Sequence, residues 1–88
     1  GEINNRVPDG KAAIAAVQSR YERGAKNIDF TDGLSIDLGD WRLNLRASNT
    51  EPLIRLNVES RGDAKLLEDK THEVLELLKS QGAVAADH

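Results

Sequence analysis

Three stretches in the middle of the chain alternate apolar and polar residues, and this alternation restricts the possible folds more than any other feature. The stretches are residues 34–38, 41–47 and 54–58. Because successive side chains on a strand point to opposite faces, each stretch is expected to form a strand with one apolar and one polar face. Gly39-Asp40, between the first two stretches, favours a two-residue hairpin turn with glycine at its first central position.

Two segments with helical periodicity lie on either side of these strands in the sequence. Apolar residues recur at spacings of three and four residues in 10–23 and in 63–80, which indicates two amphipathic helices. Each segment has an aspartate that can cap its start and a glycine that can end it: Asp9 and Gly24 for the first, Asp63 and Gly82 for the second.

Two weaker strand candidates, residues 2–7 and 26–30, complete the element order β-α-β-β-β-β-α. Two helices that each carry one apolar stripe need one apolar sheet face to cover, and an antiparallel sheet can leave its other face in water. The predicted fold is therefore α+β, an open-faced two-layer sandwich with an antiparallel sheet and two helices on one face. The polar face is expected to carry Ser35, Asp37, Arg42, Asn44, Arg46, Arg55, Asn57 and Glu59.

Length and charge limit the classes of function. We assign residues 1–82 to a single domain with one modest core, and we expect residues 83–88, which show no pattern, to be a disordered tail. The chain has no cysteine, which excludes disulfides and thiolate metal sites and fits a reducing cytoplasm. The formal net charge of −3 argues against broad nucleic-acid binding. Apolar runs are only a few residues long, which argues against a membrane span.

The connection RASNTEP concentrates hydrogen-bonding groups between two of the strands. Arg46 ends the polar face of one strand and presents a planar fork that matches phosphate or carboxylate oxygens. Ser48, Asn49 and Thr50 follow, and successive backbone N–H groups in such a turn can converge on an anion. Arg55, one strand over on the same face, would add a second cation. The residues alone leave two interpretations open, an ordinary hairpin loop and an anion site.

The histidines and acidic residues do not predict a metal site. His72 lies off the apolar stripe of the second helical segment, and His88 is the last residue. The aspartates between residues 29 and 40 match no Ca²⁺ loop, and turns recruit aspartate for local hydrogen bonds. We therefore expect no metal ligands in this chain, and we expect Trp41 to pack in the core.

A resemblance to a known family adds to this interpretation. RASNTEP followed by LIRLNVESR resembles the phosphate-binding signature in the C-terminal domain of the α-D-phosphohexomutases, most closely that of the bacterial phosphomannomutases and phosphoglucomutases. The segment from residue 32 to residue 61 is similar to that subgroup almost throughout, and GEIN at the start resembles the strand that opens the same domain. The likeness covers essentially the whole chain.

The resemblance implies a fold of the TATA-box-binding-protein (TBP) type, β-α-β4-α, which agrees with the element order above. It also implies a four-domain cytoplasmic enzyme that interconverts mannose 1-phosphate and mannose 6-phosphate through a bisphosphorylated sugar, with glucose phosphates as a further substrate class. In that family a phosphoserine and Mg²⁺ belong to other domains, so this chain is expected to hold no cofactor and to be inactive alone.

Carried over by position, the residues implied to contact the phosphate that is not transferred are Arg46, Ser48, Asn49 and Thr50. Arg55 matches an arginine of the family's next strand, and support of Glu51 or Asn57 is its alternative role. The implied partners are the phosphosugar and the other domains of the same enzyme, which this domain would help to close around the substrate.

A rival from another class is a free-standing TBP-like module that binds nucleic acid or a protein. The RASNTEP motif and the acidic balance of the chain both argue against it.

Overall fold

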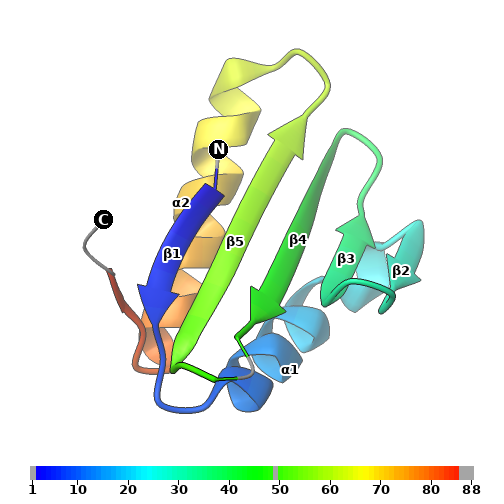
Figure 1. Ribbon diagram of the computed structural model, residues 1–88. Helices are drawn as coiled ribbons and strands as arrows, with labels where there is room; N and C mark the ends of the chain where they lie inside the picture. Colours follow the sequence, from blue (N-terminus) through cyan, green and yellow to red (C-terminus); the bar gives the residue numbers. More distant parts are fainter. Residues whose placement is uncertain (1, 49, 86–88) are drawn as a thin grey trace.

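The three alternating stretches form the middle of one sheet. The computed structural model describes residues 2–48 and 50–85, and within them the stretches become β3 (Leu34–Asp37), β4 (Trp41–Ala47) and β5 (Leu53–Ser60). These strands pair antiparallel with their neighbours (Figure 1). Gly39 has a φ of 93°, and the Leu38 N–H donates to the Trp41 carbonyl at 2.9 Å, so the predicted hairpin turn is confirmed.

Three shorter strands extend the sheet on both sides. β2 (Asn27–Asp29) pairs with β3, β1 (Glu2–Arg6) pairs with β5, and β6 (Val84–Ala85) pairs with the end of β1. The order across the sheet is β2-β3-β4-β5-β1-β6, and every pairing is antiparallel. The α+β fold class is confirmed, and the predicted order of elements along the chain, β-α-β-β-β-β-α, is found with β6 added at its end.

Both helices cover the same face of the sheet, as predicted. Figure 1 shows α1 (Gly10–Tyr21) and α2 (Ala64–Ser80) behind the strands. The Asp9 side chain accepts from the Ala12 N–H at 3.1 Å, and the Asp63 side chain accepts from the Leu66 N–H at 2.9 Å, so both predicted N-caps are formed. None of the helices in the described residues is long and apolar enough to cross a membrane.

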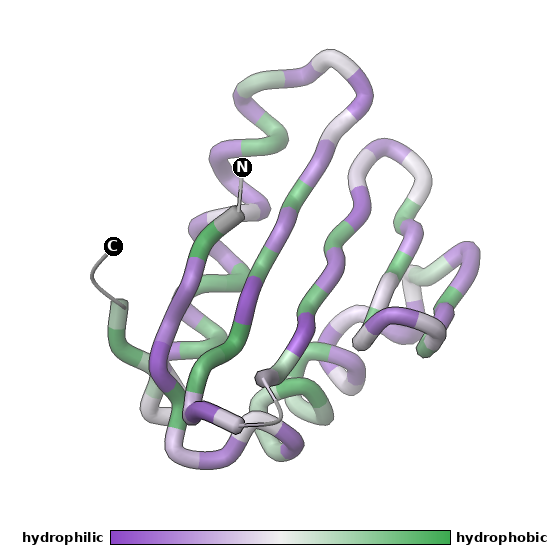
Figure 2. The backbone as a smooth tube through the Cα atoms, in the orientation of Figure 1, coloured by the Kyte–Doolittle hydropathy of each residue, from purple (hydrophilic) through white to green (hydrophobic). Residues whose placement is uncertain are grey.

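The core lies between the sheet and the helices. Figure 2 shows the alternation of green and purple along β4 and β5, and the apolar positions are the ones that turn toward the helices. The buried apolar residues are Val7, Ala13, Val17, Tyr21, Leu34, Ile36, Trp41, Leu43, Leu45, Ile54, Leu56, Val58, Val74, Leu78 and Ala83. Trp41 is buried as predicted and meets Tyr21 edge to face, with ring centroids 5.2 Å apart.

A polar contact also joins the two helices. The Tyr21 hydroxyl donates to the Glu73 carboxylate at 2.7 Å, and Arg20 and Lys70 lie 3.8 and 3.4 Å from the same carboxylate. Burial first, and the hydrogen bond to Glu73 second, raise the pKa of Tyr21. The same hydrogen bond is the main reason that the pKa of Glu73 is lowered.

Two predictions about element ends need correction. The first helix ends at Tyr21, and Glu22–Gly24 form a 3₁₀ turn closed by the Ala25 N–H on the Glu22 carbonyl, so Gly24 is part of that turn and not a residue that ends the α-helix. The predicted tail begins with structure: Ala83 is buried, its N–H donates to the Leu78 carbonyl at 3.1 Å, and β6 follows. This short segment pairs because β1 offers it a free edge. Residues 86–88 of the predicted tail, and with them His88, lie outside the described residues.

Candidate anion-binding site

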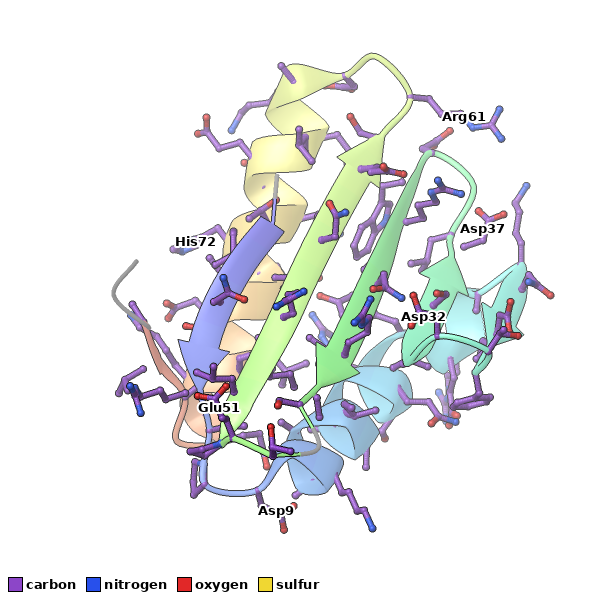
Figure 3. All side chains as sticks on the ribbon, viewed as in Figure 1. Asp9, Asp32, Asp37, Glu51, Arg61 and His72 are labelled. Atoms are coloured by element: carbon purple, nitrogen blue, oxygen red, sulfur yellow. The ribbon has the colours of Figure 1, made fainter. Side chains whose placement is uncertain are left out.

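The RASNTEP connection joins β4 to β5 at the end of the sheet where α1 begins. The Val7 N–H donates to the Pro52 carbonyl at 2.9 Å, which fixes the connection to the end of β1. Gly10, the first residue of α1, lies so close to Ala47 that a Cβ at Gly10 would be 3.0 Å from the Ala47 side chain. Figure 3 shows Asp9 and Glu51 at this same end of the molecule. The fold therefore supports the connection from two sides.

Ser48 organises the connection itself. Its N–H donates to the Leu53 carbonyl at 2.9 Å, and its hydroxyl oxygen accepts from the N–H groups of Thr50 and Glu51 at 3.3 and 3.2 Å. Successive N–H groups were expected to converge on an anion, and in the structure they converge on this hydroxyl oxygen. With its oxygen accepting twice, the Ser48 hydroxyl keeps its own hydrogen for donation to a ligand.

Four of the five predicted site residues line one hollow beside this connection. They are Arg46, Ser48, Thr50 and Arg55. The hollow has a volume of about 390 Å³, and Asn4, Ala47, Glu51, Leu53 and Ile54 complete its lining. Arg46 and Arg55 are directly opposite each other on β4 and β5, which explains how residues nine positions apart reach the same place. The fifth predicted residue, Asn49, lies outside the described residues.

A second hollow, of about 490 Å³, opens on the polar face of the sheet and shares Arg46 and Arg55 with the first. Its charged lining residues are Arg42, Arg46, Arg55, Asp29, Asp32, Asp37 and Glu59. Carboxylates therefore outnumber guanidinium groups there, whereas the described side chains of the hollow beside the connection include two arginines and a single carboxylate, that of Glu51. An anion is favoured in the hollow beside the connection by this difference in charge.

Arg46 is held from the side by the turn that precedes β3. Its Nη1 atom is 3.3 Å from the Asp32 carboxylate, and both side chains are substantially exposed, at 45% and 71%. Gly33, with a φ of 73°, lies against the same arginine: a Cβ at Gly33 would be 2.5 Å from Arg46 Cγ and 2.6 Å from the Leu45 carbonyl oxygen. The backbone of the turn thus forms a wall along the arginine stem.

Comparison with known proteins identifies the domain to which this geometry belongs. The sequence model of the phosphoglucomutase/phosphomannomutase C-terminal domain matches residues 2–77. The chain belongs to this family. It is 58% identical over 79 residues to the phosphohexose mutases of Xanthomonas campestris, and 56% identical over 80 residues to a phosphomannomutase of Salmonella montevideo. These alignments cover 90% and 91% of this chain and 18% of each relative, so the chain spans under a fifth of the length of those proteins.

A relative from the archaea and a solved structure extend the comparison. A phosphomannomutase of Methanocaldococcus jannaschii is 38% identical over 78 residues, which cover 89% of this chain and 17% of that protein. The crystal structure of a phosphoglucomutase/phosphomannomutase family protein from Burkholderia thailandensis matches 98% of this chain and 19% of its own, with a TM-score of 0.63 at 20% sequence identity. The structural likeness supports the fold of a phosphoglucomutase/phosphomannomutase C-terminal domain.

The sequence did not reveal that the turn before β3 lies against Arg46. Asp32 and Gly33 were predicted only to form a turn, because the order of residue types along the chain does not show which strand the turn will contact. The neighbouring aspartates behave as predicted for turns: Asp29 accepts from the Thr31 hydroxyl and N–H at 2.7 and 2.8 Å, and Asp37 accepts from the Gly39 N–H at 2.9 Å. The hydrogen bond from the Thr31 hydroxyl is the main cause of the lowered pKa of Asp29.

The family resemblance places Mg²⁺ in other domains of the enzyme. Within 2–48 and 50–85 no group of three or more histidine, aspartate or glutamate side chains comes together in a way that could hold a metal ion. His72 is exposed on α2 (Figure 3).

Proposed function

We propose that this domain binds the phosphate group of a phosphosugar within a full-length phosphomannomutase. The observation that carries the proposal is the hollow in which Arg46, Ser48, Thr50 and Arg55 meet. Two guanidinium groups and two hydroxyls supply several donors and fixed positive charge, which is the chemistry that a phosphate dianion requires. Asn49, between two of these residues in sequence, completes the proposed set.

The proposed contribution to the reaction is positioning and charge neutralisation. The domain would hold the phosphate that is not being transferred, so that binding energy far from the reacting end orients that end. The same site would accept the phosphate on C1 or on C6, because a bisphosphorylated hexose has to present each end in turn. A site built from phosphate donors, which reads little of the sugar, meets this need.

The chemical steps themselves are proposed to belong to other domains of the enzyme. The phosphoserine that donates the phosphoryl group and the Mg²⁺ site would be supplied there, and this chain alone would not interconvert mannose 1-phosphate and mannose 6-phosphate, or the glucose phosphates. Its partners would be the phosphosugar and those domains, which it would help to close around the substrate.

The direct test is a ¹⁵N–¹H correlation spectrum of this chain titrated with inorganic phosphate, mannose 1-phosphate and glucose 6-phosphate. We expect shifts at the amides of residues 46–50 with all three ligands, and none with mannose, because the proposed donors match phosphate oxygens. Affinity is expected in the millimolar range, since a lone phosphate site offers only a few of the contacts of the complete enzyme.

Arg46→Gln and Arg42→Gln form a matched pair for this titration. Both arginines lie on the exposed face of β4, but Arg42 lies away from the connection and bonds Glu59 at 2.6 Å. Loss of the phosphate response in the Arg46 variant alone is the expected result. An unchanged response in that variant, or an equal response to mannose, would contradict the proposed site.

A further inference from the structure

Arg46 already has an anionic partner inside the chain, and this partner has a consequence for the ligand. We propose that Asp32 is an internal competitor for Arg46 that weakens phosphate binding at the RASNTEP connection. This inference rests on the proposed function, because it concerns the affinity of that same site. The motivating contact is the one between Arg46 Nη1 and the Asp32 carboxylate, at 3.3 Å.

Arg46 stands where the two hollows meet. It lines the hollow beside the connection, with Ser48 and Thr50, and also the hollow of the polar face, with Asp32. In the structure its guanidinium donates toward Asp32, on the side of the polar face. Figure 3 shows Asp32 and Glu51 on opposite sides of the end of β4. A phosphate beside the connection must therefore share this guanidinium with Asp32 or take it from Asp32.

Asp32 is not needed to orient the side chain of Arg46. The stem of Arg46 lies against the backbone of Gly33, where even a single added carbon atom would overlap it. That contact remains whatever side chain stands at position 32. The carboxylate therefore adds little orientation beyond what the backbone supplies, and its main effect on an incoming dianion is competition and repulsion.

Asp32 is also held in place without help from Arg46. Its carbonyl oxygen accepts from the Asn44 side-chain amide at 2.8 Å, and the preceding turn is closed by the Asp29–Thr31 hydrogen bonds. The backbone of Asp32 thus stays beside Arg46 when the guanidinium turns to a ligand, which keeps the carboxylate within reach of the site. Because both partners are well exposed, the interaction is of the size of a surface ion pair, which corresponds to a two- to fivefold effect on a dissociation constant, in order of magnitude.

The test compares Asp32→Asn with Asp29→Asn by titration of this chain with inorganic phosphate, followed by amide shifts. Both substitutions remove one negative charge from the lining of the same hollow, and asparagine at position 29 can still accept from Thr31. We expect phosphate to bind roughly two- to fivefold more tightly to Asp32→Asn than to the wild type, with a clearly smaller change in Asp29→Asn. The guanidinium resonances of Arg46 should shift in ligand-free Asp32→Asn and stay in place in Asp29→Asn.

The outcomes separate this inference from the proposed function. Equal affinities of the wild type and Asp32→Asn would overturn the role of Asp32 and leave the phosphate site standing. Weaker binding by Asp32→Asn would also overturn it, because the carboxylate would then be a support for Arg46. Guanidinium resonances that do not respond to Asp32→Asn would show that the ion pair does not form in solution. Absence of any phosphate response in all three proteins would overturn both the inference and the proposed function.

Discussion

Arg46 owes its position to a glycine in a neighbouring turn. Gly33 has a left-handed backbone, with a φ of 73°. It also lies so close to Arg46 and to the Leu45 carbonyl that a Cβ at this position would overlap both. An L-residue is strained in this backbone conformation, and its Cβ would in addition meet a carbonyl group that is fixed by the pairing of β3 with β4.

Gly33→Ala and Gly62→Ala separate these two effects. Both glycines have φ near 70°, but a Cβ at Gly62 would meet nothing within 4 Å. We expect Gly62→Ala to lower the free energy of unfolding by about 1–2 kcal/mol, the cost of the left-handed conformation, and Gly33→Ala by about 3 kcal/mol or more, because the overlap adds to that cost. Urea unfolding monitored by Trp41 fluorescence measures both values. Equal losses of unfolding free energy in the two variants would show that the turn rearranges to fit the Cβ and that Gly33 does not restrict Arg46.

The sequence pointed to four residues that meet in one hollow, but not to all of the residues around them. Arg46, Ser48, Thr50 and Arg55 were predicted from hydrogen-bonding chemistry and family likeness, and all four line one hollow. Asp32 was not predicted as part of this site, because its contact with Arg46 depends on the pairing of β3 with β4, which brings Leu34 opposite Leu45 and the preceding turn beside the end of β4. A pattern of residue types specifies faces, but it does not specify such register-dependent neighbours.

At the scale of the elements, the contact between α1 and α2 is expected to depend on pH. The pKa of Glu73 is lowered in the folded state from its usual value of 4.5, mainly by the hydrogen bond from Tyr21. Because the unfolded chain binds a proton more readily, the stabilisation by Glu73 is complete above about pH 4.5 and is lost as the pH falls through the lowered pKa.

Glu73→Gln should therefore lower the free energy of unfolding at pH 7, and the difference from the wild type should shrink as the pH falls below about 4.5. The measurement is urea unfolding at a series of pH values between 3 and 7. Glu76→Gln is the control, since Glu76 lies on the same helix and pairs with the exposed Lys79. A difference between wild type and Glu73→Gln that stays constant over this range would refute the assignment.

The sequence predicted both helix starts and one of the two helix ends, that of α2, where Gly82 follows with a φ of 87°. Asp9 and Asp63 cap both helices as expected, because an N-cap is a local hydrogen bond between residues three positions apart. The first helix was predicted to extend too far along the chain. It ends earlier because the chain turns toward β2 through the 3₁₀ turn at Glu22–Gly24. The pairing of Val84–Ala85 with β1 was missed for a similar reason: two small apolar residues show no periodicity, and their partner is about eighty positions away.

At the scale of the whole molecule, the apolar core lies on one side of the sheet only, so the cost of a substitution depends on which side it falls. Leu56 at the centre of β5 is fully buried, whereas Phe30 is 61% exposed. We expect Leu56→Ala to lower the free energy of unfolding by about 2–5 kcal/mol, a large part of the roughly 4–13 kcal/mol available to a chain of this length. Phe30→Ala should change it by less than about 0.5 kcal/mol. A loss at Phe30 close to that at Leu56 in chemical denaturation would contradict the exposed position of Phe30 outside the core.

The largest functional effect is expected in the full-length enzyme. Removal of Arg46 by Arg46→Ala would delete charge-assisted hydrogen bonds worth about 1.5–3 kcal/mol, so kcat/KM should fall by roughly 10- to 150-fold. Steady-state kinetics with mannose 1-phosphate measure this, and Arg42→Ala, on the same strand, is the control. Turnover of the Arg46 variant at the wild-type rate would refute the proposed role of this residue.

The pairing order of the sheet also bears on how the molecule behaves in a crowded solution. The long strands β4 and β5 are enclosed on both sides, while β2, with three residues, forms one edge and β6, with two, covers the end of β1 near the other. A foreign strand that arrives at either short segment finds few unpaired N–H and C=O groups, which is how natural sheets avoid fusing into fibrils. Loss of β6 would uncover the end of β1 and lengthen one of these edges. Val84 and Ala85, which the sequence assigned to a tail, are thus expected to reduce aggregation by covering this edge.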